Sequence, residues 1–201
     1  MEKFRRRHAE LPANLYRVQY PGCQTALSGN GLQAKETNVT YTEDDMNAFR
    51  ESIIKQLTWG HRGDQPYITC FSEKDHAENW ACKEPWNHGE YGNESWSLLT
   101  IDTKLMPEAY VFSLKDLVTQ LDLALPEMAS QHVKGGYLCL HRIPTTAIVY
   151  SASAREVKND VEDRKWQETY HPLDDYSGSD LEAAENNWND DIMKMVEGDW
   201  N

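Results

Sequence analysis

The sequence predicts an α+β domain, because several short strand-like runs are interspersed with only a few helical patterns. Runs rich in β-branched and aromatic residues recur along the chain, each bounded by Gly, Pro, Asn or Ser. Apolar residues at three- and four-residue spacing, which predict amphipathic helices, occur in fewer places. Because the two kinds of pattern do not alternate regularly, a doubly wound parallel sheet is not expected.

The predicted strands are bounded by turn residues. The first strand ends at Pro21-Gly22, and Pro144 separates the last two strands. The segments with strand composition are 14–20, 67–71, 96–102, 136–143 and 146–153. Segments rich in Gly, Pro, Ser or Asn are predicted to be loops, and they are 23–38, 59–66 and 83–95.

The first two predicted helices begin at small polar residues. Thr42, followed by Asp45 three residues later, is expected to cap an amphipathic helix over 43–57. Ser72 ends the run ITCF and is expected to cap a second helix that continues to about Cys82.

The remaining helical patterns lie in the second half of the chain. Residues 111–125 begin extended and become helical after Ser113. Apolar residues at helical spacing predict an amphipathic helix over 180–196, within a strongly acidic end. The chain is therefore divided into a domain over 11–153 and an acidic extension over 154–201.

Composition excludes several classes of protein. The net charge of −13 argues against binding to duplex nucleic acid, which needs a broad basic face. No apolar run is long enough to span a membrane, and the basic N-terminus lacks the apolar segment of a secretory signal. The four cysteines form no CxxC pair, which is typical of reduced thiols in a cytoplasmic protein.

The common catalytic and metal-binding motifs are absent. No GxGxxG, GxxxxGK[ST], HExxH or GxSxG occurs in the sequence. The residues His76, Cys82 and His88 are the nearest approach to a metal site, but their spacing matches no common zinc pattern. No bound metal is expected.

Three motifs in order carry a resemblance to a known family. LYRV occurs on the first predicted strand, ITCFS leads into a helix with AENWA, and YLCLHRIPTTAIV follows late in the chain. From about Leu15 to Val149 the chain resembles the arginine–serine–glutamate class of the ADP-ribosyltransferase-like superfamily. It looks closest to uncharacterised fungal domains of that group. The resemblance implies split antiparallel sheets with flanking helices, and NAD as a possible substrate.

The resemblance assigns ligand-binding roles to the first two motifs. Arg17 matches the arginine that grips the phosphates of NAD, a role suited to a rigid, always charged guanidinium. The alternative for Arg17 is an ion pair with a carboxylate at a sheet edge. The Ser-Thr-Ser motif of the family aligns with Cys70, Phe71 and Ser72, so only the last serine is kept. Thr69 offers a hydroxyl one residue earlier, although strand alternation directs it to the opposite face.

The catalytic glutamate of the family has no equivalent. Its position falls at Gly136, and the nearest carboxylates, Asp122 and Glu127, lie in or just after a predicted helix. The absence of a positioned carboxylate typically slows such a reaction by about 10² to 10⁴. Gly135-Gly136 leaves room for a different ligand or forms a bulge at a strand start. The active site is therefore expected to be diverged.

Three functions remain open. The first is a transferase that binds NAD or another ribosyl-phosphate ligand. The second is a tRNA-dependent, arginine-containing cyclodipeptide synthase, in which FRRRH (4–8) and Lys134 would receive the aminoacyl end of tRNA. The third is a catalytically inactive binding module. Trp59 and Trp86, in predicted loops, are candidates for the rim of the site, whereas Trp80 and His141 are expected to be structural.

Overall fold

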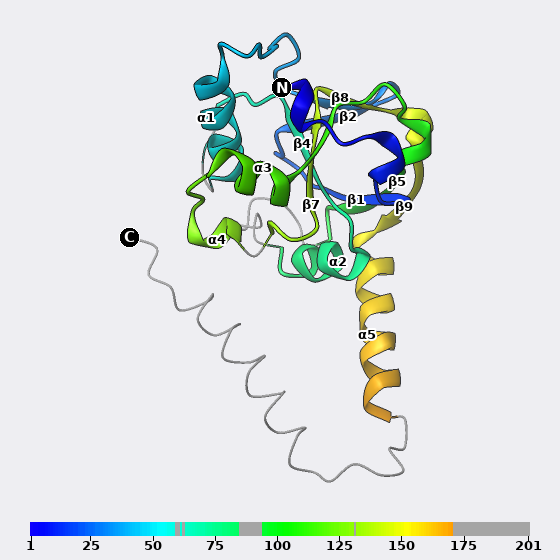
Figure 1. Ribbon diagram of the computed structural model, residues 1–201. Helices are drawn as coiled ribbons and strands as arrows, with labels where there is room; N and C mark the ends of the chain where they lie inside the picture. The colour runs from blue at the N-terminus through cyan, green and yellow to red at the C-terminus, as the bar shows by residue number, and fades with distance from the viewer. Residues whose placement is uncertain (59–60, 62, 85–93, 131, 171–201) are drawn as a thin grey trace. The chain divides into compact units, whose positions relative to one another are not determined.

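The protein is described by a computed structural model (Figure 1), which covers residues 1–58, 61, 63–84, 94–130 and 132–170. These residues form an α+β structure with two antiparallel sheets and several helices. The predicted fold class is confirmed at this level.

The larger sheet has six strands in the order β6-β7-β4-β1-β5-β9. Its strands are β1 (Asn14–Gln19), β4 (Tyr67–Phe71), β5 (Ser97–Asp102), β6 (Val111–Ser113), β7 (Gly136–Leu140) and β9 (Ile148–Ser153). The smaller sheet has three strands in the order β2-β3-β8, which are β2 (Thr25–Ser28), β3 (Gly31–Ala34) and β8 (Arg142–Pro144).

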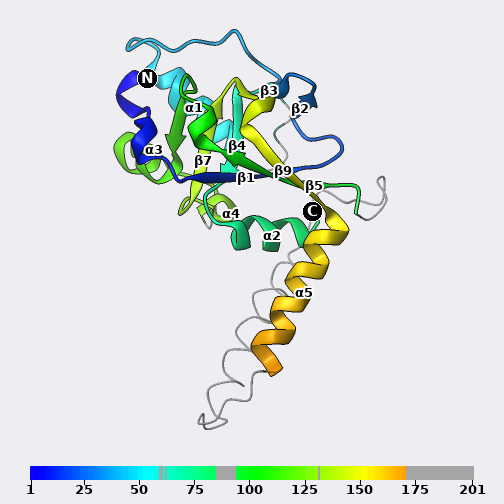
Figure 2. The ribbon, with the colours of Figure 1, turned by 90° about the vertical axis from the view of Figure 1, so that its right-hand side faces the viewer.

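The helices are α1 (Met46–Leu57), α2 (Lys74–Cys82), α3 (Leu114–Leu121), α4 (Glu127–Ser130) and α5 (Ala154–Tyr170). Short 3₁₀ turns occur at Glu2–Phe4, His8–Glu10, Thr103–Leu105 and Thr145–Ala147. In Figure 2 helix α2 lies below strand β1, and strands β2 and β3 lie above it. The six-stranded sheet therefore has helices on one face and the smaller sheet on the other.

The segment predicted as a loop over 23–38 instead contains the hairpin of β2 and β3. Leu27 faces Leu32 across the hairpin, and Ser28 faces Gly31. Gly31 has a φ of 102°, and a Cβ built there would lie 2.1 Å from the Ile143 carbonyl oxygen, so the close approach to β8 requires glycine. The loop prediction was wrong here because both strands are short and the turn between them is rich in residues that are typical of loops.

The run predicted as one strand over 136–143 is broken at His141. His141 has a φ of 63°, and the strand that follows it belongs to the smaller sheet. Its backbone N–H donates to the Pro66 carbonyl and its own carbonyl accepts from Ala34 N–H, each at 2.7 Å. The imidazole Nε2 donates to the Val39 carbonyl at 2.9 Å. His141 thus joins the two sheets, in agreement with the structural role expected for it.

Two helix starts differ from the predictions. Helix α1 begins at Met46 rather than at residue 43, and the Asp45 carboxylate accepts from the backbone N–H of Thr42 at 2.9 Å and from its hydroxyl at 2.7 Å. Helix α2 has Glu73 at its N-cap, with no side-chain hydrogen bond there, so Ser72 is not its cap. Helix α3, in contrast, begins after Ser113 as predicted, and the Ser113 side chain caps it.

The core consists of three clusters. One lies between the two sheets and includes Leu15, Cys70, Cys139 and Ile143. A second packs α1 and α3 against the larger sheet, and a third packs α2 and the start of α5 against it. Because the central strands of the larger sheet are buried on both faces, their side chains alternate between these clusters, whereas the edge strand β9 is largely exposed.

The packed unit extends beyond 11–153 at both ends. Phe4 is 8% exposed and stacks on Phe49 with ring centroids 5.8 Å apart. Val157 and Val161 on α5 are buried in the third cluster. The compact unit covers Met1–Glu162, and a second unit covers Asp163–Asn201. The predicted helix over 180–196 lies outside the described residues. In the described chain no helix combines the length and apolar character needed to cross a membrane.

Candidate functional site

Arg17 lies on the face of the larger sheet that is turned toward the smaller sheet. Arg17 lies two residues from Leu15 on β1, so both side chains share one face, and Leu15 is buried between the sheets. Arg17 also pairs with Leu99 on β5. The fold therefore directs the arginine of LYRV into the space between the two sheets rather than toward the helices.

Strands β1 and β4 separate beside Arg17. They share a single register pair, Tyr16 with Phe71, whereas β4 and β7 pair along their full length. Arg17 bridges the gap: its Nη1 donates to the Thr69 carbonyl at 2.9 Å, and its Nη2 donates to the Thr25 hydroxyl at 3.1 Å. The guanidinium thus links β1, β4 and β2, and this fixes its position.

The charge of Arg17 is not neutralised by an acidic residue of the described chain. The ion pairs found there do not include it, and its buried Nε has no hydrogen-bond partner. The alternative of an ion pair at a sheet edge is therefore not realised within the described residues. A half-buried guanidinium with donors to spare is suited to binding an anion.

The residues of the second motif do not converge on Arg17 through their side chains. The hydroxyl of Thr69 accepts from Gln56 Nε2 of α1 at 3.1 Å, so it lies on the helix side, as strand alternation predicts. Cys70 shares the face of Arg17 but is fully buried. Its thiol hydrogen-bonds with that of Cys139, and this bond, together with burial, raises the pKa of Cys139 well above its ordinary value. Cys70 is therefore part of the core.

Gly136 also lies away from Arg17. Gly136 faces Phe71, on the opposite side of the sheet from Arg17. A Cβ built on Gly136 would lie 2.3 Å from the His132 carbonyl oxygen and 2.5 Å from Leu114 Cδ1. The space that was expected beside Gly136 for a different ligand is therefore occupied by His132 and Leu114. Ser72 follows β4 and donates its backbone N–H to the Gly135 carbonyl at 2.8 Å.

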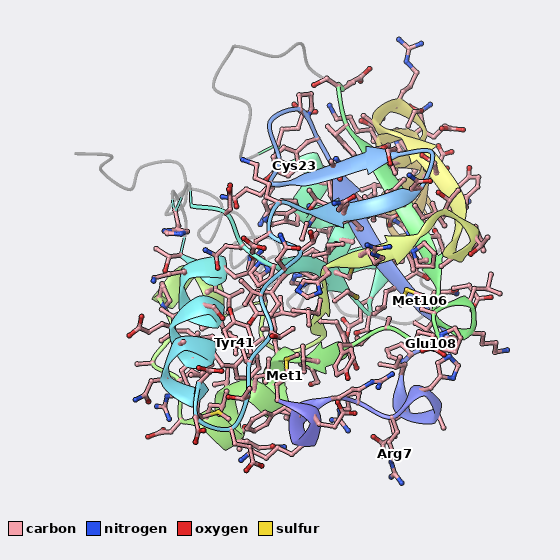
Figure 3. The ribbon with its side chains drawn as sticks, turned by 90° about the horizontal axis from the view of Figure 1, so that it is seen from above. Met1, Arg7, Cys23, Tyr41, Met106 and Glu108 are labelled. Atoms are coloured by element: carbon pink, nitrogen blue, oxygen red, sulfur yellow. The ribbon has the colours of Figure 1, made fainter. Side chains whose placement is uncertain are left out.

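Polar side chains that the sequence did not single out are connected to Arg17 through its partner Thr25. Gln19, two residues along β1, donates from Nε2 to the Thr25 carbonyl and approaches Cys23 Sγ, each at 2.9 Å. Gln24 donates from Nε2 to the His61 carbonyl at 2.8 Å. Figure 3 shows Cys23 beside the β2–β3 hairpin, far from Arg7 in that view. Because residues 23–38 were predicted to be a loop, the contacts of Cys23, Gln24 and Thr25 could not be predicted from the sequence.

A second polar arrangement, also missed, joins two histidines that are distant in the sequence. His76 Nε2 lies 2.9 Å from His132 Nδ1, and the Phe71 ring centroid lies 4.8 and 5.8 Å from theirs. Burial lowers the pKa of both imidazoles, that of His132 to about 4. His76 therefore pairs with His132. Among the described residues no group of three or more His, Cys, Asp or Glu side chains could hold a metal ion.

The basic segment FRRRH is engaged in ion pairs. Arg5 pairs with Glu2, Arg6 with Glu10 and Asp116, and Arg7 with Glu10. These ion pairs neutralise much of the positive charge that the segment would need in order to bind the phosphates of an RNA end.

The three tryptophans for which a role was predicted, Trp59, Trp80 and Trp86, separate into two groups. Trp80 packs on Tyr20 and Phe71, with ring centroids 6.2 Å apart in each pair, which is the structural role expected. Trp59 and Trp86 lie outside the described residues, as does His88.

The comparison with protein families is consistent with one domain over most of the chain. A family described as a domain of unknown function (DUF7587) matches residues 10–157, from just before β1 to the first turn of α5. No curated protein matches the sequence. Because the match covers more than half of the sequence, the chain belongs to the DUF7587 family.

Proposed function

We propose that this protein is a transferase of the ADP-ribosyltransferase-like fold that binds NAD or another ribosyl-phosphate ligand at a diverged active site. The two antiparallel sheets, the separation of β1 from β4, and the position of LYRV on β1 support this proposal. The reduced state of the four cysteines supports a cytoplasmic location.

The observation that carries the proposal is the environment of Arg17. Burying a charge is costly unless an opposite charge or hydrogen bonds compensate it. Two neutral oxygens, from Thr69 and Thr25, contact this guanidinium, and no carboxylate of the described chain pairs with it. A phosphate group would supply the missing negative charge and accept the remaining N–H donors.

A catalytically inactive binding module is the second candidate. It is favoured by the packing at Gly136, which leaves no room for a glutamate on that strand position. The tRNA-dependent cyclodipeptide synthase is supported less than these two candidates, because the arginines of FRRRH that would receive the tRNA end are engaged in ion pairs.

Calorimetric titration with NAD and with ADP-ribose tests the proposed site. Arg17→Lys keeps a positive charge but loses the planar fork, so we expect at least about tenfold weaker binding. The exposed Arg142 on β8 offers a matched control, and Arg142→Lys should leave binding unchanged. Equal binding to wild type and Arg17→Lys would refute the site.

Product analysis then separates the candidate functions. Mass spectrometry after incubation with NAD should detect released nicotinamide if the protein is a transferase or hydrolase. Binding without release would identify the inactive module. Formation of a cyclic dipeptide in a parallel incubation with aminoacyl-tRNA would identify the synthase instead.

A further inference from the structure

Buried polar atoms without a hydrogen-bond partner gather near Arg17. In the described chain they include Arg17 Nε and the amide oxygens Oε1 of Gln19 and Gln24, together with Gln65 Oε1, whose residue contacts His61 as Gln24 does. Arg6 Nε, among the ion pairs of the N-terminal segment, is a separate case. Folded proteins leave few such atoms, because a buried polar atom is destabilising when neither the protein nor water nor another ligand satisfies it. Their concentration in one place indicates a site whose ligand provides the missing partners.

The orientation of two of these amides is fixed by their other contacts. Gln19 Nε2 lies 2.9 Å from the Thr25 carbonyl, and Gln24 Nε2 lies 2.8 Å from the His61 carbonyl. A carbonyl oxygen can only accept, so each contact requires the NH₂ group of the amide. The unpaired atom of each amide is therefore the oxygen Oε1, which is a hydrogen-bond acceptor.

Gln19 and Gln24 are connected to Arg17 through Thr25. Arg17 contacts the hydroxyl of Thr25, Gln19 contacts its carbonyl, and Gln24 precedes it in the chain. Gln19 is also two residues from Arg17 on the same face of β1, which separates their Cα atoms by about 7 Å. The three side chains are half-buried as a whole, but their unpaired atoms, Arg17 Nε and the two amide oxygens, are themselves buried.

We propose that Gln19 and Gln24 are specificity-determining residues that accept hydrogen bonds from the ligand at Arg17. The ligand then carries an anionic group for Arg17 and neighbouring hydroxyl or amide donors for the two glutamines. A phosphorylated ribose has this chemistry, because its hydroxyls lie a few bonds from the phosphate. This inference rests on the proposed function and names the part of the ligand that the two glutamines recognise.

The test compares two probes, ADP-ribose and inorganic pyrophosphate, by calorimetry. Pyrophosphate carries the charge but lacks the hydroxyl donors. Gln19→Met and Gln24→Met keep the length of the side chain but remove both the acceptor and the NH₂ group that contacts the Thr25 or His61 carbonyl. We expect each variant to bind ADP-ribose about three- to tenfold more weakly than wild type and to bind pyrophosphate equally well. Gln33→Met, at an exposed position of β3, should change neither affinity.

The possible results separate this inference from the proposed function. If Arg17→Lys weakens binding of ADP-ribose but neither glutamine variant does, the inference is overturned and the proposed function stands. Equal loss of ADP-ribose and pyrophosphate binding in both glutamine variants would also overturn it, because the glutamines would then act only through Arg17. If the wild-type protein binds neither probe, the proposed function fails and the inference fails with it. Thermal unfolding of each variant confirms that it is folded, and the two glutamine variants test the inference independently.

Discussion

The guanidinium of Arg17 donates to the main-chain carbonyl of Thr69 at 2.9 Å, at the point where β1 and β4 stop pairing. A side chain therefore takes the place of a ladder hydrogen bond between two central strands of the sheet. The same guanidinium reaches the Thr25 hydroxyl of the smaller sheet. Arg17 thus has a structural role in addition to the ligand-binding role proposed for it.

Truncation of Arg17 should lower the stability of the protein. Arg17→Ala leaves the Thr69 carbonyl and the Thr25 hydroxyl without these donors, and we expect the free energy of unfolding to fall by about 1–3 kcal/mol. Denaturant titration followed by tryptophan fluorescence measures this change. Arg142→Ala, at an exposed position, should stay within about 0.5 kcal/mol of wild type. An unchanged midpoint for Arg17→Ala would show that the bridge between the strands contributes nothing.

Substitution of Gly136 should be destabilising rather than restore a catalytic site. Gly136→Ala places a Cβ within 2.5 Å of both the His132 carbonyl and Leu114, so we expect a loss of about 1–3 kcal/mol in the free energy of unfolding. Gly29, which has no atom within 4 Å of an added Cβ, provides the matched control. Differential scanning calorimetry compares the two variants. Equal melting temperatures would contradict the packing described for Gly136.

Acid should destabilise the fold through His76 and His132. Burial, followed by the charges of His76 and Lys83, lowers the pKa of His132 from 6.5 to about 4 in the folded chain. The unfolded chain then binds more protons between these values, so the free energy of unfolding falls as the pH falls from about 6.5 to 4 and levels off below. We expect His132 to contribute about 1–2 kcal/mol to this loss, after allowance for solvent screening of its exposed part.

The measurement is urea unfolding at a series of pH values. His132→Asn keeps a short hydrogen-bonding side chain but cannot titrate, so its stability should vary less with pH in that window. Gln33→Asn, at an exposed position of β3, changes no titratable group; it serves as the control and should keep the wild-type slope. A wild-type slope in His132→Asn would remove the histidine pair as the cause.

The four thiols should differ in reactivity. Cys70 and Cys139 are buried and hydrogen-bonded to each other, and the raised pKa of Cys139 keeps it protonated at neutral pH. Cys23 and Cys82 are half-buried. Because the thiolate is the reactive form, iodoacetamide should modify the native protein at Cys23 and Cys82 first, and all four cysteines only after unfolding. Peptide mass spectrometry reads out the sites. Rapid labelling of Cys70 in the native protein would contradict its place in the core.

Local patterns in the sequence were sufficient to predict several elements. Strand composition located β1, β4 and β5 closely, because β-branched and aromatic residues suit a buried, pleated surface. Apolar spacing located α1, and the change from an extended to a helical pattern after Ser113 located the start of α3. These features depend on residues that are neighbours in the sequence.

The surroundings of the candidate site were decided by contacts between distant segments. The sequence singled out Arg17, but its contacts with Thr25 and Thr69 depend on how β2 and β4 pack beside β1. The break at His141, which moves the chain from one sheet to the other, is stabilised by hydrogen bonds to Pro66 and Ala34. The sequence by itself therefore determined the kinds of elements and one charged residue of the site. Only the tertiary structure decided what surrounds that residue, because hydrogen bonds between distant segments leave no periodic pattern in the sequence.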